Sequence, residues 1–177
     1  MKAPLFEYPS FHYKIKDWNF KKKALLGKIK EENFVRTPLQ SFETDRQKNG
    51  KSYIHYLKDL LSPELNEFCR ESKVTCSMTD AWFVRYQKND YQIVHNHRGW
   101  GFSGIIYLEY DSKVHTPTFF VAPWQEPITD TTSISMPKNI EEGDMLIFPS
   151  YTLHFVNPNE SKKKRIILSF DLLPESN

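Results

Sequence analysis

The chain has little of what marks several large classes of protein. Its two cysteines, Cys69 and Cys76, are too few for a disulfide framework and lack the spacing of a zinc ribbon. No stretch approaches the about 20 apolar residues of a membrane-spanning helix. The opening "MKAPLFEYPSF" lacks the apolar core of a secretory signal. We therefore expect a cytoplasmic protein with no membrane partner, in which both thiols are reduced and buried.

An excess of charge of one sign is also missing. The 24 Lys and Arg residues face 22 Asp and Glu residues, so the net charge is only +2, without the basic stripe typical of nucleic-acid-binding proteins. The run Lys162–Lys164 is interpreted as a solvated loop before a strand. The length of 177 residues and the 39% hydrophobic content suit a single domain over residues 1–177. We see no linker that would divide it.

Residues 1–73 are predicted to form a mainly helical support region. "DWNFKKKALLGKIKEENF" places apolar residues at helical spacing between charges and favours an amphipathic helix that begins near Asp17. "SYIHYLKDLL" has the same periodicity. Ser62 then fits an N-cap and Pro63 the first position of another helix. These helices are expected to pack on one face of a sheet.

Residues 74–177 read instead as an antiparallel β domain. Segments such as "SGIIYLEY" and "KRIILSFDLL" are short, rich in β-branched and aromatic residues, and separated by turn formers. Successive strand residues point to opposite faces. In the last of these strands one face carries Ile166, Leu168, Phe170 and Leu172, and the other carries Arg165, Ile167, Ser169 and Asp171. The first face favours a helix layer and the second a partly polar cavity, which predicts a β-sandwich or barrel.

The stretch "IVHNHRGWGF" holds two histidines, His95 and His97, one residue apart. In an extended segment both imidazoles lie on the same face and can reach one metal ion. His154, beside a strand end in "FPSYTLHFVNPN", is the natural third ligand. Three neutral imidazoles suit iron, zinc, copper or nickel and leave a position open for water or substrate. The alternative is that these are ordinary hydrogen-bonded histidines, which is our interpretation of His12, His55 and His115.

The order of these motifs resembles that of the 2-oxoglutarate- and Fe(II)-dependent oxygenases, in particular the prolyl-4-hydroxylase-like branch and its bacterial and phage relatives. The likeness covers over half of the chain: His95-x-His97, then "SGIIYL", then "GDMLIFPSYTLHFVNPN" with His154, then Arg165 in "RIILSF". It implies a mainly β fold, a double-stranded β-helix of the jelly-roll or cupin-like kind, buttressed by the N-terminal helices. It also implies that the three histidines bind Fe(II).

The resemblance further implies a site for 2-oxoglutarate as co-substrate. Arg165 takes the place of the basic residue that pairs with its far carboxylate, and a guanidinium on an inward strand face matches a carboxylate bidentately on physical grounds alone. Tyr107 and Tyr86 resemble the tyrosines that add hydroxyl donors, and Ser169 lies on the same strand face as Arg165. The family's commonest triad has an acidic residue at its second position, where this chain has His97.

Structural roles remain as alternatives for these co-substrate residues. Arg165 could form an internal salt bridge with Asp171 or Glu109. Tyr86 and Tyr107 could be core aromatics, because buried tyrosines are common.

The activity implied by the resemblance is hydroxylation of a substrate C–H bond, with conversion of 2-oxoglutarate and O₂ to succinate and CO₂. "RGWGF" and the long "WQEPITDTTSISMPKNIEE" are expected to form a rim and lid, in which Arg98, Trp100 and Trp124 contact substrate. The alternative for each tryptophan is that it stabilises a loop. The substrate is a peptide or a small molecule that the sequence does not specify.

Two other kinds of function fit the same pattern of residues. One is a different three-histidine metalloenzyme, such as a cupin-type isomerase or a zinc hydro-lyase, which would hold zinc and not bind 2-oxoglutarate. The other is a non-catalytic jelly-roll binding module, whose stability and partner binding would survive replacement of all three histidines.

Overall fold

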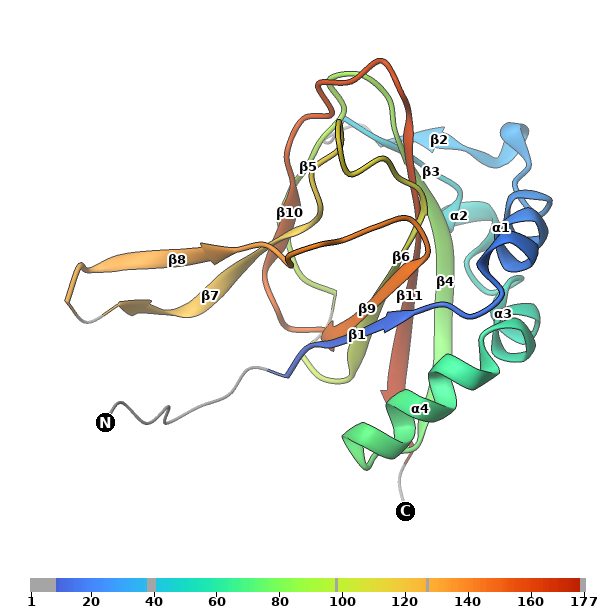
Figure 1. The fold of residues 1–177 in the computed structure, drawn as a ribbon, viewed down its shortest axis with the longest axis horizontal. Helices are drawn as coiled ribbons and strands as arrows, with labels where there is room; N and C mark the ends of the chain where they lie inside the picture. Colours follow the sequence, from blue (N-terminus) through green and yellow to red (C-terminus); the bar gives the residue numbers. More distant parts are fainter. Residues whose placement is uncertain (1–8, 38–40, 98, 127, 176–177) are drawn as a thin grey trace.

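Two antiparallel sheets stack face to face, and helices cover one of them (Figure 1). The computed structural model describes residues 9–37, 41–97, 99–126 and 128–175. The larger sheet has seven strands in the order β1-β9-β6-β11-β4-β3-β2, and the smaller has four in the order β5-β10-β7-β8. This arrangement confirms the predicted double-stranded β-helix, mainly β, with supporting helices.

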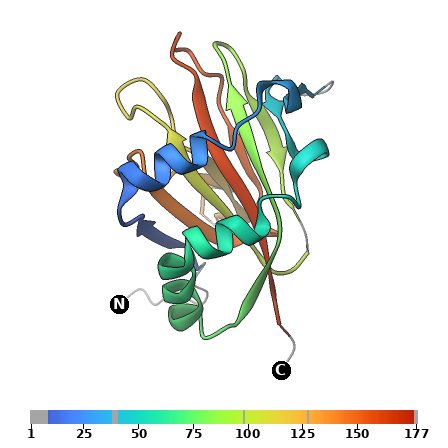
Figure 2. The same cartoon turned by 90° about the vertical axis from the view of Figure 1, so that its right-hand side faces the viewer.

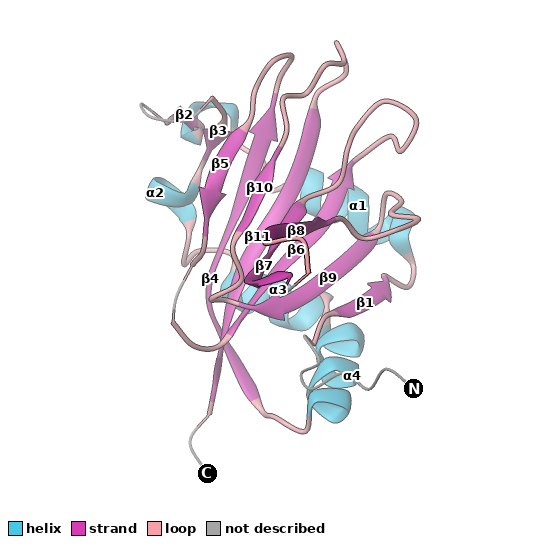
Figure 3. Cartoon of the chain, turned by 90° about the vertical axis from the view of Figure 1, so that its left-hand side faces the viewer, coloured by secondary structure: helices cyan, strands magenta, loops and turns pink. Residues whose placement is uncertain are grey.

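Neighbouring strands in both sheets come from distant parts of the chain. The large sheet contains β1 (Phe11–Lys14), β2 (Val35–Arg36), β3 (Glu43–Thr44), β4 (Cys76–Tyr86), β6 (Phe102–Glu109), β9 (Asp144–Pro149) and β11 (Arg165–Pro174). The small sheet contains β5 (Gln92–His95), β7 (Phe119–Glu126), β8 (Thr131–Ser135) and β10 (His154–Val156). The chain therefore alternates between the sheets, and Figure 3 shows the small sheet lying over the face of the large sheet that the helices leave free.

The helices all lie on the outer face of the large sheet (Figure 2). They are α1 (Trp18–Leu26), α2 (Arg46–Asn49), α3 (Ile54–Leu60) and α4 (Ser62–Ser72), together with a short 3₁₀ helix, η1 (Glu31–Asn33). Pro63 lies in the first turn of α4, as expected, but Leu61 and not Ser62 is the N-cap. No helix in the described ranges is long and apolar enough to cross a membrane.

The alternating faces of β11 separate two hydrophobic cores. Leu168 and Phe170 are fully buried against helix residues that include Leu57 and Phe68. On the opposite face Ile167 packs in the core between the sheets. Complete burial of an aliphatic or aromatic side chain stabilises the fold by about 1.5–3 kcal/mol. The predicted division into a helix-facing side and a cavity-facing side is confirmed.

The structure differs from the sequence expectation where the strands are short. The N-terminal region contributes β1, β2 and β3 to the large sheet as well as helices. Strands of two to four residues show too little alternation to be recognised in the sequence. The predicted lid loop is also wrong for Thr131–Ser135, which forms β8 and pairs with β7. These two strands project from the body as an arm (Figure 1).

The two cysteines are free but only partly buried, where we expected complete burial. Cys69 lies in α4 and Cys76 begins β4. Burial, together with the nearby Cys69 and Glu175, raises the pKa of the Cys76 thiol to about 11. The thiolate of Cys76 is therefore scarce at neutral pH, and the thiol is correspondingly unreactive.

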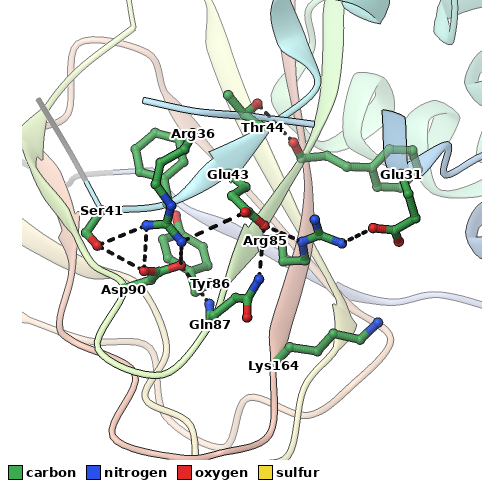
Figure 4. Close-up of polar contacts among 12 residues, drawn as sticks. Glu31, Arg36, Ser41, Glu43, Thr44, Arg85, Tyr86, Gln87, Asp90 and Lys164 are labelled. Atoms are coloured by element: carbon green, nitrogen blue, oxygen red, sulfur yellow. Dashed lines mark hydrogen bonds and ion pairs between the residues drawn. The ribbon is translucent and has the colours of Figure 1, made fainter. Parts of the chain in front are cut away.

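A polar network ties the N-terminal β2–β3 hairpin to the turn before β5 (Figure 4). Arg36 of β2 donates to the buried Asp90 carboxylate over 2.9 Å, and Ser41 donates to the same carboxylate over 2.9 Å. Arg85 of β4 donates to Glu43 of β3 over 2.7 Å. Hydrogen bonds to charged groups are stronger than neutral ones. The hairpin thereby fixes the turn from which the first histidine strand starts.

Candidate functional site

Three histidines meet at one end of the small sheet. His95 ends β5 and His154 begins β10, and the two are direct partners in the antiparallel ladder. His97 follows β5 in a loop that is held by a backbone hydrogen bond from the His97 N–H to the Ser150 carbonyl, 3.0 Å. One nitrogen from each ring lies within 4.8 Å of the others. The structure thus brings together all three predicted metal ligands.

The hydrogen-bond partners of the rings assign one tautomer to all three histidines. Nδ1 of His95 lies 2.9 Å from the Ile93 carbonyl, and Nδ1 of His154 lies 2.8 Å from the Thr152 carbonyl. Nδ1 of His97 lies 2.7 Å from the Asp171 carboxylate. These oxygens accept hydrogen bonds, so each Nδ1 carries the proton and each Nε2 keeps its lone pair. Three lone pairs are therefore available to one cation.

Burial keeps two of these imidazoles neutral. Burial, together with the neighbouring His95 and His97, lowers the pKa of His154 to about 3. Burial likewise lowers the pKa of His95 to about 4. Because a metal ion binds only the neutral imidazole, both side chains are ready to bind a metal at neutral pH without first losing a proton.

We expect the metal-free protein to lose stability as the pH falls below about 6.5, the pKa of a histidine in an unfolded chain. The folded-state pKa values of His95 and His154 lie below that value. At pH values between the folded-state and unfolded-state pKa, the unfolded chain therefore binds more protons than the folded one. The neutral histidines contribute their full share of the free energy of unfolding above about pH 6.5. As the pH falls, this contribution decreases until about pH 4 for His95 and about pH 3 for His154. Urea unfolding across this range measures the decline.

A matched pair of variants isolates the contribution of one ring to this decline. His154→Gln removes a buried titratable ring, and the free energy of unfolding should then depend less steeply on pH. His55→Gln changes an exposed residue of α3 and should leave the slope of the wild type. A wild-type slope in the His154→Gln protein would contradict the assignment.

The three histidines line a small cavity between the two sheets. Its walls mix polar and apolar side chains from both sheets and from the adjoining loops: Trp82, Val84, Gln92, His95, His97, Ile105, Thr118, His154, Val156, Ile167 and Ser169. Two of these, Ile167 and Ser169, come from the inward face of β11. The polar cavity predicted from strand alternation is therefore present, with the histidines at one side of it.

Arg165 is buried beside this cavity within a group of aromatic rings. Its guanidinium carbon lies 5.1 Å from the ring centre of Tyr86, 5.6 Å from that of Tyr107 and 5.9 Å from that of Tyr110. Nη2 donates to the Thr118 hydroxyl over 3.2 Å. Within the described part of the chain, Nε and Nη1 are buried without a hydrogen-bond partner. A buried guanidinium in this state needs an anion.

The internal salt bridge considered for Arg165 is not formed. Asp171 lies against His97 and Arg46, and Glu109 pairs with Lys164 over 3.5 Å. The carboxylate that would neutralise Arg165 is thus not supplied by either predicted alternative.

The other predicted co-substrate residues lie around the same space. The Tyr86 hydroxyl donates to the Gln92 amide oxygen over 2.6 Å, and the Tyr107 hydroxyl accepts from the Thr118 N–H over 3.2 Å. Both rings are completely buried in the core between the sheets, so each tyrosine combines a packing role with a polar one. Ser169 lines the cavity directly.

The predicted rim residues are more dispersed. Trp100 is 59% exposed in the loop after His97. Trp124 lies in the β7–β8 arm, where it lines a separate apolar groove with Phe120 and Met136 and is not part of the histidine cavity. Arg98 lies outside the described residues. Of the two described residues, Trp100 follows the histidine pair closely along the chain, whereas Trp124 lies in the arm.

Sequence reasoning missed three residues of the site. Gln92 places its amide nitrogen 3.1 Å from Nε2 of His95, Thr118 links Arg165 to the cavity, and Asp171 contacts His97. The inward face of β11 pointed to Asp171, and the position of Gln92 on the strand that ends at His95 was a usable signal. Nothing in the local pattern around Thr118 marks it.

The arrangement combines a cluster of neutral nitrogen ligands with a buried cation. The histidine nitrogens can bind a transition metal, and the unsatisfied guanidinium can bind a carboxylate. A small molecule with a metal-chelating end and a carboxylate end would use both features at once.

Comparison with known proteins gives one family and one fold. Residues 80–171 match the model of a family described as "Putative 2OG-Fe(II) oxygenase". The matched segment contains every histidine of the cluster together with Arg165 and Asp171. No curated protein matches the sequence.

Solved structures of 2-oxoglutarate-dependent enzymes share the fold. The viral collagen prolyl hydroxylase of Paramecium bursaria Chlorella virus-1, in complex with 2-oxoglutarate, is 15% identical with a TM-score of 0.59, covering 94% of this chain and 96% of its own. A prolyl-4-hydroxylase from Pseudomonas putida is 12% identical with a TM-score of 0.62, and the match covers 96% of this chain and 94% of the hydroxylase. The alpha-ketoglutarate-dependent carbocyclase SnoK of nogalamycin biosynthesis is 13% identical with a TM-score of 0.67, covering 94% and 79%.

Proposed function

The chain belongs to the 2OG-Fe(II) oxygenase family, and we propose that it hydroxylates a C–H bond of its substrate at an iron held by His95, His97 and His154. As a member of this family it is an oxidoreductase that uses Fe(II), 2-oxoglutarate and O₂. The ligand assignment is supported by the clustering of the three rings and by their common tautomer.

The observation that carries the co-substrate assignment is the buried guanidinium of Arg165. Its Nε and Nη1 atoms have no partner among the described residues, and a planar guanidinium fits a carboxylate with two parallel hydrogen bonds. Thr118 connects the two parts of the site, because its hydroxyl accepts a hydrogen bond from Arg165 and the residue also lines the histidine cavity. We assign the far carboxylate of 2-oxoglutarate to Arg165.

The remaining residues of the cavity orient the bound groups and keep water out. Ile105, Val156 and Ile167 form apolar walls, which limit the access of water to the reaction. Gln92 links the Tyr86 hydroxyl to Nε2 of His95. Once that nitrogen binds a metal, the Gln92 amide is free to donate to a ligand of the metal.

When bound, Fe(II) and 2-oxoglutarate would activate O₂, which is the oxidant: oxidation of the keto acid to succinate and CO₂ would supply two of its four electrons, and the substrate C–H bond the other two. The protein contributes the placement of the substrate bond next to the metal. We propose that Ser169, Tyr107 and Tyr86 support the co-substrate, and that Trp100 and Arg98 contact the substrate. The proposed substrate is a peptide or a small molecule, and a cytoplasmic location stays a prediction.

A titration under anaerobic conditions tests this function. Addition of 2-oxoglutarate to the Fe(II)-loaded protein should produce a visible charge-transfer absorption band, because a chelated keto acid accepts electron density from Fe(II). Admission of O₂ should then yield succinate in an amount that depends on Fe(II). A zinc-loaded sample is the matched control and should show neither the band nor succinate.

The opposite result would favour a different function. Protein that retains zinc through purification and shows no response to 2-oxoglutarate in either test would support a three-histidine zinc enzyme in place of the oxygenase.

A further inference from the structure

We infer that Asp171 is a positioning residue for the metal site. Asp171 holds His97 in place, and through that ring it supplies the negative charge that three neutral ligands lack. The inference rests on the proposed function, because it takes the three histidines as metal ligands. It adds to that function a carboxylate on a different strand and in a different sheet.

The contact between Asp171 and His97 is short and buried. Asp171 lies on the inward face of β11 and its side chain is 1% exposed, while that of His97 is 8% exposed. Its Oδ1 accepts from Nδ1 of His97 over 2.7 Å and from the Ser103 hydroxyl over 2.9 Å. A carboxylate that accepts from Nδ1 turns Nε2 of the same ring toward the metal and makes it a better electron donor.

A purely structural role as the partner of Arg46 fits the distances less well. Nη2 of Arg46 lies 3.6 Å from Oδ2 of Asp171, whereas its Nε lies 3.0 Å from Asp80. Arg46 is also stacked on Trp82, 3.8 Å from the ring centre, and its side chain is 44% exposed. Of the two described residues that form ion pairs with Asp171, His97 is therefore the closer, at 2.7 Å against 3.6 Å for Arg46.

The backbone brings the His97 loop against the strand that carries Asp171. Gly101, at the end of this loop, has a φ of 90°. A Cβ atom at Gly101 would lie only 2.6 Å from the Leu172 carbonyl oxygen, closer than two such atoms can approach. The loop is thus packed onto β11 at the residue next to Asp171, and only glycine permits this approach.

The charge of the site explains why a carboxylate is useful at this point. Three imidazoles leave the two positive charges of Fe(II) uncompensated, whereas open Fe(II) sites commonly combine two histidines with one carboxylate. Asp171 places one negative charge a single hydrogen bond away from the second ligand. Carboxylate–histidine–metal arrangements of this kind typically account for about 10- to 100-fold in metal affinity or activity.

The substitution Asp171→Asn removes the charge but leaves an oxygen that can accept from His97. We expect Fe(II) affinity, measured anaerobically against a competing chelator, to fall about 10- to 100-fold. The Fe(III)/Fe(II) potential of the loaded protein should rise, because a lost negative charge favours the lower oxidation state. A residue that only supports the fold would not shift the potential of protein that has bound its full iron content.

Asp144→Asn is a matched control. Asp144 is equally buried, 1% exposed, and contacts His12 over 3.0 Å in another strand of the large sheet. The same loss of charge at this position should leave both the Fe(II) affinity and the potential unchanged. Wild-type affinity and potential in the Asp171→Asn protein would overturn the inference.

A double variant gives a second, independent test of the role of Asp171. His97→Asp/Asp171→Asn moves the carboxylate from the supporting position to the ligand position and keeps an amide that can donate to it. We expect this protein to bind Fe(II) more tightly than either single variant, because His97→Asp alone sets two carboxylates against each other. A double variant no tighter than the single variants would contradict the proposed exchange of roles.

Failure of the underlying function would look different from failure of this inference. Wild-type protein that binds no Fe(II) would remove the metal site itself. If the wild-type protein binds Fe(II) and the Asp171→Asn protein has the same Fe(II) affinity and potential, only the role of Asp171 would be contradicted.

Discussion

Replacement of Arg165 by Leu should weaken the binding of 2-oxoglutarate by about ten- to several-hundred-fold, since each hydrogen bond to a charged group contributes about 1.5–3 kcal/mol. The buried guanidinium has two nitrogens without a partner among the described residues, and leucine offers none. Binding of Fe(II) should be retained because no histidine is changed. Anaerobic titration of 2-oxoglutarate into iron-loaded protein, with the iron content determined for each sample, measures the effect.

Two further substitutions make the Arg165 result specific. Arg165→Lys should bind with intermediate affinity, because a point charge replaces the fork without its geometry. Arg85→Leu alters an arginine on the neighbouring strand β4, whose guanidinium pairs with Glu31 and Glu43 outside the cavity. It should retain wild-type affinity for 2-oxoglutarate. Unchanged affinity in folded Arg165→Leu protein would place the carboxylate partner elsewhere.

Removal of a single ligand, in His154→Ala, should abolish most Fe(II) binding. His154 is 3% exposed and lies in the centre of the cluster, with its ring 4.2 Å from that of His95 and 5.2 Å from that of His97 between centroids. Loss of a ligand should reduce the Fe(II) affinity by more than the loss of a residue that only supports a ligand, which typically reduces it about 10- to 100-fold. Iron content after anaerobic loading and desalting measures the loss.

The control for this substitution is another buried histidine. His115 is 7% exposed and contacts the Asp111 N–H and the Lys163 carbonyl, away from the cluster. His115→Ala alters the packing of a buried ring to a similar extent, yet it should bind as much iron as the wild type. Equal iron content in His154→Ala and wild-type protein would rule out His154 as a ligand.

The clustering of the three histidines and the inward position of Arg165 could be predicted from the sequence because their signals are local. His95 and His97 are rare residues at strand spacing, and His154 lies beside a strand end. Arg165 begins a strand and lies on its mixed polar face, opposite the apolar face with Leu168 and Phe170. Such patterns depend only on the alternation of a strand, and the two cores of the structure follow it.

The supporting contacts could not be predicted because they depend on which distant residues become neighbours. Asp171 was placed on the inward face, but its partner His97 lies 74 positions away in a loop. Thr118, the residue immediately before β7, reaches Arg165 of the large sheet. The register of the strands and the path of the loops decide these contacts, and no short stretch of sequence encodes either.

The short strands escaped recognition for a related reason. β2 and β3 contain two residues each, so no period can be read from them. They become strands because β4 offers an edge and because ion pairs such as Arg36–Asp90 hold the hairpin in place. β8 is exposed along its whole length and gains its order from pairing with β7.

The position of β11 in the large sheet has a consequence for how the molecule folds. This strand comes last in sequence order, yet it lies in the middle of the sheet between β4 and β6. Until it is in place, β4 and β6 present unpaired edges that can associate with other chains. Contacts between residues so far apart in sequence also make folding slow. Because β11 carries both Arg165 and Asp171, the step that closes the sheet also brings these two residues to their places, and we expect partly folded chains not to bind 2-oxoglutarate.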